Sequence, residues 1–135
     1  MSRRIVIVDT NVLVAGLLTG NPASPVLDGM LSAVFPFEVS EALLAEYCNV
    51  LVRPALHRQH GLTATEIDAL LTDIAQHAIV LTPATGSRPP DPGDQLLWDL
   101  LATRTALVLV TCDRALSADA KMQSRVLCPR DFVEG

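Results

Sequence analysis

Two short runs of aliphatic residues constrain the fold of this chain more than any other feature of its sequence. They are Ile5-Val6-Ile7-Val8 near one end and Leu107-Val108-Leu109-Val110 near the other. A continuous apolar run of this length is typical of a strand buried on both faces, as in a parallel sheet. Helical patterns lie between the runs, and no tight hairpin turn joins two strands. This order predicts an α/β sandwich with right-handed crossover connections.

The other elements follow from apolar spacing and from turn residues. We expect helices at 24–31, 41–52, 63–77 and 94–103, and another around 115–121. Short strands are expected at 34–39, 78–81 and 125–127, and the Pro- and Gly-rich stretch 82–93 is expected to be a loop.

Three local signals refine the helix boundaries. Ser24 followed by Pro25 is typical of a helix start, with the serine as the cap. Thr63 and Glu66 have the spacing of a capping box. The pair at 53–54, Arg then Pro, is expected to stop or kink the preceding helix.

Length and composition set the class of protein. The 135 residues are expected to form one domain, 1–135, and an apolar content of 50% argues against disorder. The three cysteines form no C-x-x-C pair, which favours free thiols in a reducing compartment. No apolar run is long enough for a membrane span or a signal-peptide core, so a soluble, cytoplasmic protein is expected. The net charge of −5 argues at first against a nucleic-acid partner.

Two acidic residues follow the two buried strands. Asp9 comes directly after the first run, and Asp113 comes three residues after the last residue of the second. Ligands of an open parallel sheet bind beyond the carboxyl ends of its strands. If these strands are neighbours, the two carboxylates face one crevice.

Two further acids lie on predicted helices. Asp94 shares a helix face with apolar residues three, four and seven positions later, so it is expected to point inward at the start of its helix. Glu46 lies at the border of the apolar face of helix 41–52. Each acid taken singly has an ordinary role, as a helix cap, a loop start or a solvated side chain. Gathered in one crevice, four carboxylates would require a cation, and oxygen ligands favour Mg²⁺ or Mn²⁺.

The order of these motifs resembles that of the PIN-domain ribonucleases, and in particular the VapC-like toxins of toxin–antitoxin systems. The opening Asp-Thr-Asn at 9–11, Glu46 with the Val-Leu-Val-Arg-Pro at 50–54, Asp94 after Asp-Pro-Gly, and the Val-Thr-Cys-Asp at 110–113 correspond to four successive motifs. The ending at 127–132 is also similar to that subfamily. The resemblance covers essentially the whole chain.

The resemblance implies a three-layer α/β/α sandwich with a central, mostly parallel twisted sheet, and a Mg²⁺- or Mn²⁺-dependent endoribonuclease acting on single-stranded RNA. It makes Asp9, Glu46, Asp94 and Asp113 the metal-binding and catalytic acids. The supporting polar residues would be Thr10, Asn11 and Thr111, with the Thr10 hydroxyl orienting a carboxylate. Proteins of this kind commonly form dimers and pair with a small cognate antitoxin protein.

Two alternatives bear on this expectation. Many relatives carry another acid two residues after the fourth-motif Asp, and this chain has Ala115 there, so one or two metal ions can be envisaged. A catalytically weak or inactive PIN fold that binds RNA or a protein therefore stays open. Phosphatases that begin with a strand and an Asp need a second Asp where Asn11 stands, which disfavours that class. Bound divalent cations would offset most of the net negative charge, which removes the argument against RNA.

Overall fold

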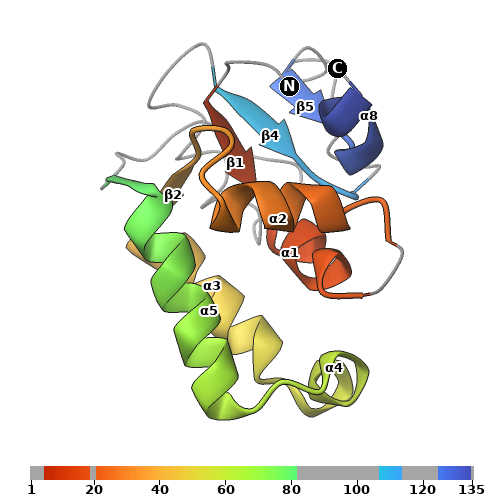
Figure 1. Ribbon diagram of the computed structural model, residues 1–135, viewed down its shortest axis with the longest axis vertical. Coiled ribbons are helices and arrows are strands. Elements are labelled where there is room, and N and C mark those ends of the chain that lie inside the picture. Colours follow the sequence, from red (N-terminus) through yellow and green to blue (C-terminus); the bar gives the residue numbers. More distant parts are fainter. Residues whose placement is uncertain (1–4, 19–20, 82–106, 114–124, 135) are drawn as a thin grey trace.

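The computed structural model of the protein describes residues 5–18, 21–81, 107–113 and 125–134. Figure 1 shows the helices and strands in these segments. The strands are β1 (Val6–Val8), β2 (Glu38–Ser40), β3 (Ile79–Leu81), β4 (Val108–Val110) and β5 (Val126–Leu127). The helices are α1 (Thr10–Gly16), α2 (Ser24–Leu31), α3 (Glu41–Leu51), α4 (Pro54–His60), α5 (Ala64–His77) and α8 (Pro129–Glu134).

The strands of the described segments pair in parallel throughout. One ladder has the order β1-β4-β5 and a second joins β2 to β3. A parallel bridge between Val6 and Phe37 brings the two ladders together at β1 and β2, and the Val6 N–H donates to the Pro36 carbonyl at 3.1 Å. The predicted α/β class with a parallel sheet is confirmed, and the two runs that predicted it are neighbours in the sheet.

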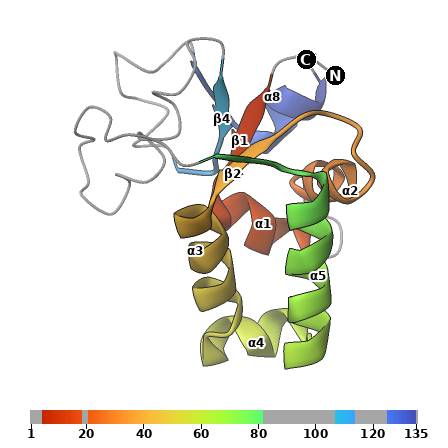
Figure 2. The ribbon, with the colours of Figure 1, turned by 90° about the vertical axis from the view of Figure 1, so that its left-hand side faces the viewer.

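Helices α3, α4 and α5 form an arm beside the sheet. Figure 2 shows α3 and α5 side by side, with α4 across their far ends and α1 near the junction with the strands. Leu13 of α1, Leu43 of α3 and Ile74 of α5 are fully buried. Burial of these aliphatic side chains joins the arm to α1 and so fixes α3 beside the end of β1.

Side chains cap two helix starts, and the second of these caps was predicted from the sequence. The Ser40 hydroxyl accepts a hydrogen bond from the Leu43 N–H at 3.1 Å and caps α3. Thr63 and Glu66 form the predicted capping box of α5, with both hydrogen bonds at 3.1 Å. Since α3 ends at Leu51, its predicted range of 41–52 is correct within one residue.

Other boundaries differ from the prediction. Helix α1 was not predicted, because the apolar residues that follow Asn11 show no clear helical period. The predicted stop at Arg53-Pro54 is confirmed, because α3 ends at Leu51. Pro54 then occupies the first turn of α4, a helix that was not predicted, where its fixed φ suits a helix and its missing N–H costs nothing. Gly61 then ends α4 with a φ of 68°.

The start of α2 and the bounds of β2 also differ. Ala23, not Ser24, is the cap residue of α2, and the Ser24 hydroxyl donates instead to the Leu18 carbonyl at 3.0 Å. Strand β2 begins four residues later than the predicted 34–39 and ends at Ser40. The predicted loop 82–93 and the helices at 94–103 and 115–121 lie outside the described residues.

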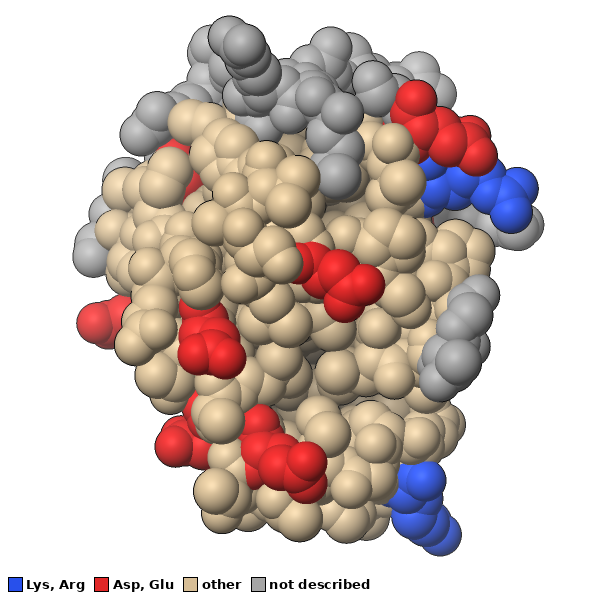
Figure 3. All heavy atoms as spheres, viewed as in Figure 1, with Lys and Arg blue, Asp and Glu red and all other residues tan. Residues whose placement is uncertain are grey.

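The described surface carries charge of both signs, unevenly placed. On the face drawn in Figure 3, acidic side chains are spread over much of the molecule, whereas basic ones lie toward one edge. Within the segments that the structure describes, no helix combines the length and apolar character needed to cross a membrane.

Candidate active site

The ends of β1 and β4 lie side by side and form the base of the site. Val8 pairs with Val110, and the Asp9 N–H donates to the Val110 carbonyl at 2.9 Å. Asp9 and Thr111 therefore leave the sheet at the same edge, and α1 begins directly after Asp9. Asp113 follows two residues beyond Thr111.

The carboxylate of Asp9 is buried, with 8% of the residue exposed. The Thr111 hydroxyl, itself buried, donates to Asp9 Oδ2 at 2.7 Å. Burial raises the pKa of the Asp9 carboxyl above its usual value, and the charges of Glu46 and Asp113 raise it further. The hydrogen bonds from the Thr111 hydroxyl and the Thr10 backbone lower this pKa but do not offset the increase.

Asn11 connects Asp9 to the end of β4. Its Nδ2 lies 3.4 Å from Asp9 Oδ2 and 3.3 Å from Thr111 Oγ1, and its Oδ1 accepts the Cys112 N–H at 3.1 Å. The Asp113 N–H donates to Thr111 Oγ1 at 3.0 Å. These contacts between α1 and the chain after β4 fix the backbone on both sides of the crevice.

Glu46 is held from the neighbouring helix. The Thr10 hydroxyl donates to Glu46 Oε2 at 2.7 Å, which links the first residue of α1 to the middle of α3. Thr10 is itself buried, with 6% of the residue exposed. The Thr10 hydroxyl thus contacts one of the predicted acids, and its role in orienting that carboxylate stays a prediction.

Tyr47 is a supporting residue that the sequence did not single out. It is fully buried, and its hydroxyl donates to the Val8 carbonyl at 2.5 Å, one residue before Asp9. Burial and the charges of Asp9 and Glu46 raise the pKa of the phenol, so it stays a hydrogen-bond donor. Apolar spacing placed Tyr47 on the buried face of its helix, but no sequence signal points to the partner of its hydroxyl.

Cys112 is exposed between two site residues, yet its environment does not activate it. Partial burial and the charges of Asp9 and Cys128 raise the pKa of its thiol. A thiol with a raised pKa has little thiolate at neutral pH and is a poor nucleophile. Cys112 is therefore not a candidate nucleophile of this site.

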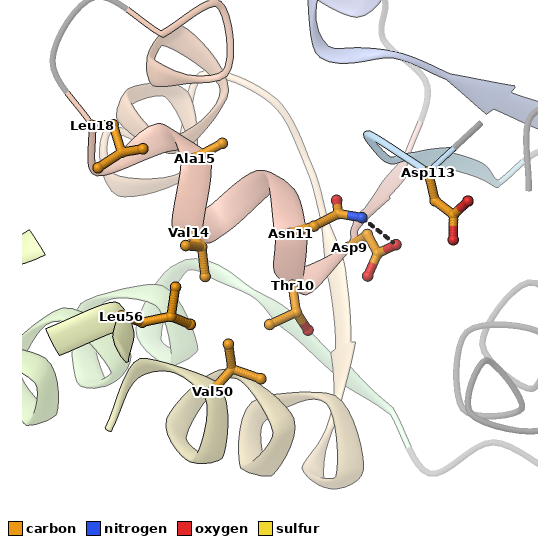
Figure 4. A pocket seen from close by; sticks show the side chains of 9 residues that line it. All are labelled: Asp9, Thr10, Asn11, Val14, Ala15, Leu18, Val50, Leu56 and Asp113. Atoms are coloured by element: carbon orange, nitrogen blue, oxygen red, sulfur yellow. Dashed lines mark hydrogen bonds between the residues drawn. The ribbon is translucent and has the colours of Figure 1, made fainter. Parts of the chain in front are cut away.

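The site opens into a crevice with a volume of about 440 Å³. Figure 4 shows Asp9, Thr10, Asn11 and Asp113 at one end of it. The other end is apolar and lies between α1, α3 and α4. Its walls are Val14, Ala15, Leu18, Val50 and Leu56.

The acids at this site offer the oxygen ligands that a divalent cation prefers, although the described ones do not form a closed ligand shell. Asp9 is close enough to Glu46 and Asp113 for their charges to raise its pKa, and a cation would relieve that repulsion. All the donors are oxygen atoms, which suit Mg²⁺ or Mn²⁺. In the described part of the chain, no three acidic, His or Cys side chains are grouped tightly enough to hold an ion. Asp94, the remaining predicted acid, lies outside that part.

Comparison with known proteins gives the family. The profile of the PIN domain matches residues 5–115, so the chain belongs to the PIN-domain family. PIN domains are generally nucleases, and they generally use divalent metal ions. No curated protein matches the chain closely enough to count as a relative.

Proposed function

We propose that the protein is a metal-dependent ribonuclease that hydrolyses phosphodiester bonds of single-stranded RNA. The observation that carries the proposal is the buried Asp9 carboxylate, which is fixed by Thr111 and lies in the electrostatic field of Glu46 and Asp113. A buried acid surrounded by further acids is costly unless it serves a cation or a proton transfer. Within a nuclease family, a cation that contacts the scissile phosphate is the simpler use.

Each residue of the site has a defined part in this proposal. Asp9, Glu46, Asp94 and Asp113 would hold Mg²⁺ or Mn²⁺, which when bound supplies a water of lowered pKa and positive charge at the phosphate. The hydroxyls of Thr10 and Thr111 keep Glu46 and Asp9 in their orientations. Asn11 holds the end of β4 against α1, so that Asp113 stays beside the crevice.

The crevice favours single-stranded RNA as the substrate. It begins where β1 and β4 end, and it is an open crevice rather than an enclosed cavity. Both a single strand and a duplex expose their phosphates, but only a single strand can turn its bases outward without breaking base pairs. A phosphate of such a strand can reach the acids at the polar end.

We further propose that the protein is the toxin of a toxin–antitoxin pair. The support is the match of sequence motifs. The main ones are Glu46 with the Val-Leu-Val-Arg-Pro at 50–54, and the Pro-Arg-Asp-Phe of 129–132, which begins α8. The partners expected from this role are a small cognate antitoxin and a second copy of the chain.

Cleavage of a single-stranded RNA by the wild type, Asp9→Asn and Asp28→Asn tests the ribonuclease proposal. Asp28 is an exposed acid on α2 and serves as the matched control. In Mg²⁺ or Mn²⁺, Asp9→Asn is expected to cleave RNA at least about 100-fold more slowly than the wild type. Mutation of a residue that only supports a metal ligand already lowers metal affinity or activity about 10–100-fold. The control should match the wild type, and EDTA should abolish cleavage by both.

Two outcomes would contradict the proposal in different ways. Undiminished cleavage by Asp9→Asn would remove the acid from the reaction. RNA binding without cleavage in any divalent cation would favour the alternative of an inactive binding module. Two features support that alternative: Ala115 stands where many relatives have an acid, and the described acids do not form a closed group of metal ligands.

A further inference from the structure

The crevice changes its chemistry along its length, and the proposed reaction uses only one end. Asp9 and Asp113 lie at the polar end, whereas the walls of the other end are the aliphatic side chains of α1, α3 and α4. Val14 and Ala15 come from α1, and Val50 and Leu56 come from α3 and α4. All four are half-buried, so the surface that they form is accessible to a ligand.

A phosphodiester at the acids brings a nucleoside with it. Each phosphate of an RNA strand is bonded to a ribose on both sides, and each ribose carries a base whose faces are apolar. The crevice volume of about 440 Å³ lies in the range of about 300–1,000 Å³ that is typical of pockets for small ligands. This volume covers both ends of the crevice, so it leaves room for a phosphate at the acids and a base at the apolar end.

We propose that the apolar half of this crevice is a nucleoside subsite that takes the base next to the scissile phosphate. The inference rests on the proposed ribonuclease function, which places the phosphate at the acids. The same walls would also fit an apolar side chain of a protein partner. Continuity with the acids favours the nucleoside, because the substrate itself tethers it at that distance.

The residues at the subsite predict what it can distinguish. The side chains of its walls are aliphatic and offer no hydrogen bond to the edge of a base. Discrimination between bases needs such hydrogen bonds, whereas contact with an apolar surface depends mainly on the area covered. The subsite should therefore require a base without strongly selecting which one.

Leu56→Ala combined with an abasic substrate tests the subsite. Alanine is a strong helix former, so α4 should persist in the variant. The substrate is an oligoribonucleotide with one mapped cleavage site, intact or with the base removed from the nucleotide on either side. On intact RNA we expect Leu56→Ala to lower kcat/KM about tenfold, mainly through KM. When the base that occupies the subsite is absent, wild type and variant should cleave equally, as in a double-mutant cycle.

Two further variants complete the design. Val52 lies just beyond α3, is 52% exposed and does not line the crevice. The variant Val52→Ala should therefore behave as the wild type on every substrate. Ala15→Leu adds bulk inside the apolar half and should lower kcat/KM on intact RNA more than on the abasic substrate. Ala15→Leu fills the subsite and Leu56→Ala enlarges it. Both should lower kcat/KM, and both losses should depend on the presence of the base.

The outcomes separate this inference from the function on which it rests. Equal losses on intact and abasic RNA would overturn the subsite, as would no effect of Leu56→Ala on either substrate. The second result would leave the apolar half to a protein partner. In both cases, continued sensitivity of cleavage to Asp9→Asn would show that the ribonuclease proposal stands. Absence of cleavage of intact RNA by the wild type in Mg²⁺ and Mn²⁺ would overturn both.

Discussion

Asp9 carries an electrostatic cost that only part of its surroundings offsets. Its carboxylate accepts a short hydrogen bond from Thr111, yet burial and two neighbouring acids keep its pKa above the usual value. The folded protein therefore binds a proton at Asp9 more tightly than the unfolded chain does. By linkage, ionised Asp9 destabilises the metal-free fold, and this loss develops as the pH rises from the unfolded pKa of about 3.9 through the raised folded pKa.

Asp9→Asn should accordingly raise the melting temperature of the protein in EDTA at pH 7. The amide keeps an oxygen for the Thr111 hydroxyl but carries no charge. The difference from the wild type should shrink as the pH falls toward 4, because the wild-type acid then gains its proton. Thermal unfolding followed by circular dichroism across this pH range measures the effect, with Asp28→Asn as the control. If Asp9→Asn melts at a lower temperature than the wild type at pH 7, ionised Asp9 does not destabilise the metal-free fold.

Thr10 provides a second test at the residue scale. Thr10→Val removes the hydroxyl that donates to Glu46 but keeps the shape of the buried side chain. We expect RNA cleavage to fall about 10–100-fold, the usual effect of losing a partner that orients a metal ligand. Thr10→Ser restores the donor and should recover most of the rate. Equal activity of the valine and serine variants would show that Thr10 does not act through Glu46.

At this scale the sequence predicted that Asp9 and Asp113 lie near each other. It did not predict the long-range hydrogen bonds that hold the residues around them in place. Asp9 and Asp113 could be placed at one edge because parallel strands present their carboxyl ends together. The hydroxyl of Tyr47 bonds to a carbonyl 39 positions away, and Asn11 reaches across 100 positions to Thr111. Such contacts depend on the packing of distant segments, which no local pattern encodes. The roles of the predicted acids stay a prediction, as does the position of Asp94.

Among the helices, α2 is held by an aromatic cluster that also anchors the carboxyl-terminal helix. The Phe35 ring contacts Phe132 of α8 edge-on, with centroids 5.0 Å apart, and Phe37 at 6.2 Å. Gly29 of α2 lies directly against Phe35, and a Cβ there would approach the ring carbon Cε1 to 2.6 Å. The close approach of α2 to this cluster requires a residue without a side chain.

Gly29→Ala should therefore destabilise the fold although alanine favours a helix. The Phe35 ring cannot move aside without disturbing Phe132, so overpacking is expected to cost about 1–3 kcal/mol. Urea denaturation measures the free energy of unfolding, and Asp28→Ala, at the neighbouring exposed position, is the control for helix propensity. A variant as stable as the wild type would show that the cluster has room to relax.

At the scale of elements, the sequence predicted those whose signals are local. The capping box at Thr63 and Glu66 lies where it was predicted, because each side chain only has to reach an N–H group three residues away. Helix α1 was missed because its apolar run fits a strand as well as a buried helix, and the two differ only in tertiary packing. The helix stop at Arg53-Pro54 was predicted, whereas α4 was not, because none of its residues is fully buried and it leaves no clear apolar pattern in the sequence.

For the molecule as a whole, the balance of charge depends on what the site holds. The formal net charge is −5, and Figure 3 shows acids over much of one face. A polyanionic substrate is attracted poorly to such a surface unless cations change its local field. Bound divalent ions are the largest local charges in a site of this kind. RNA cleavage at this site therefore requires that the acids of the crevice bind such an ion.

Calorimetric titration of Mn²⁺ into the protein tests this dependence most directly. The wild type and Asp28→Asn should bind Mn²⁺ with the same affinity, and Asp9→Asn should bind it at least about tenfold more weakly. Asp94→Ala is expected to weaken binding as well. Equal affinities of the wild type and Asp9→Asn, or no binding of Mn²⁺ by the wild type, would contradict the central claim that these acids hold a divalent cation.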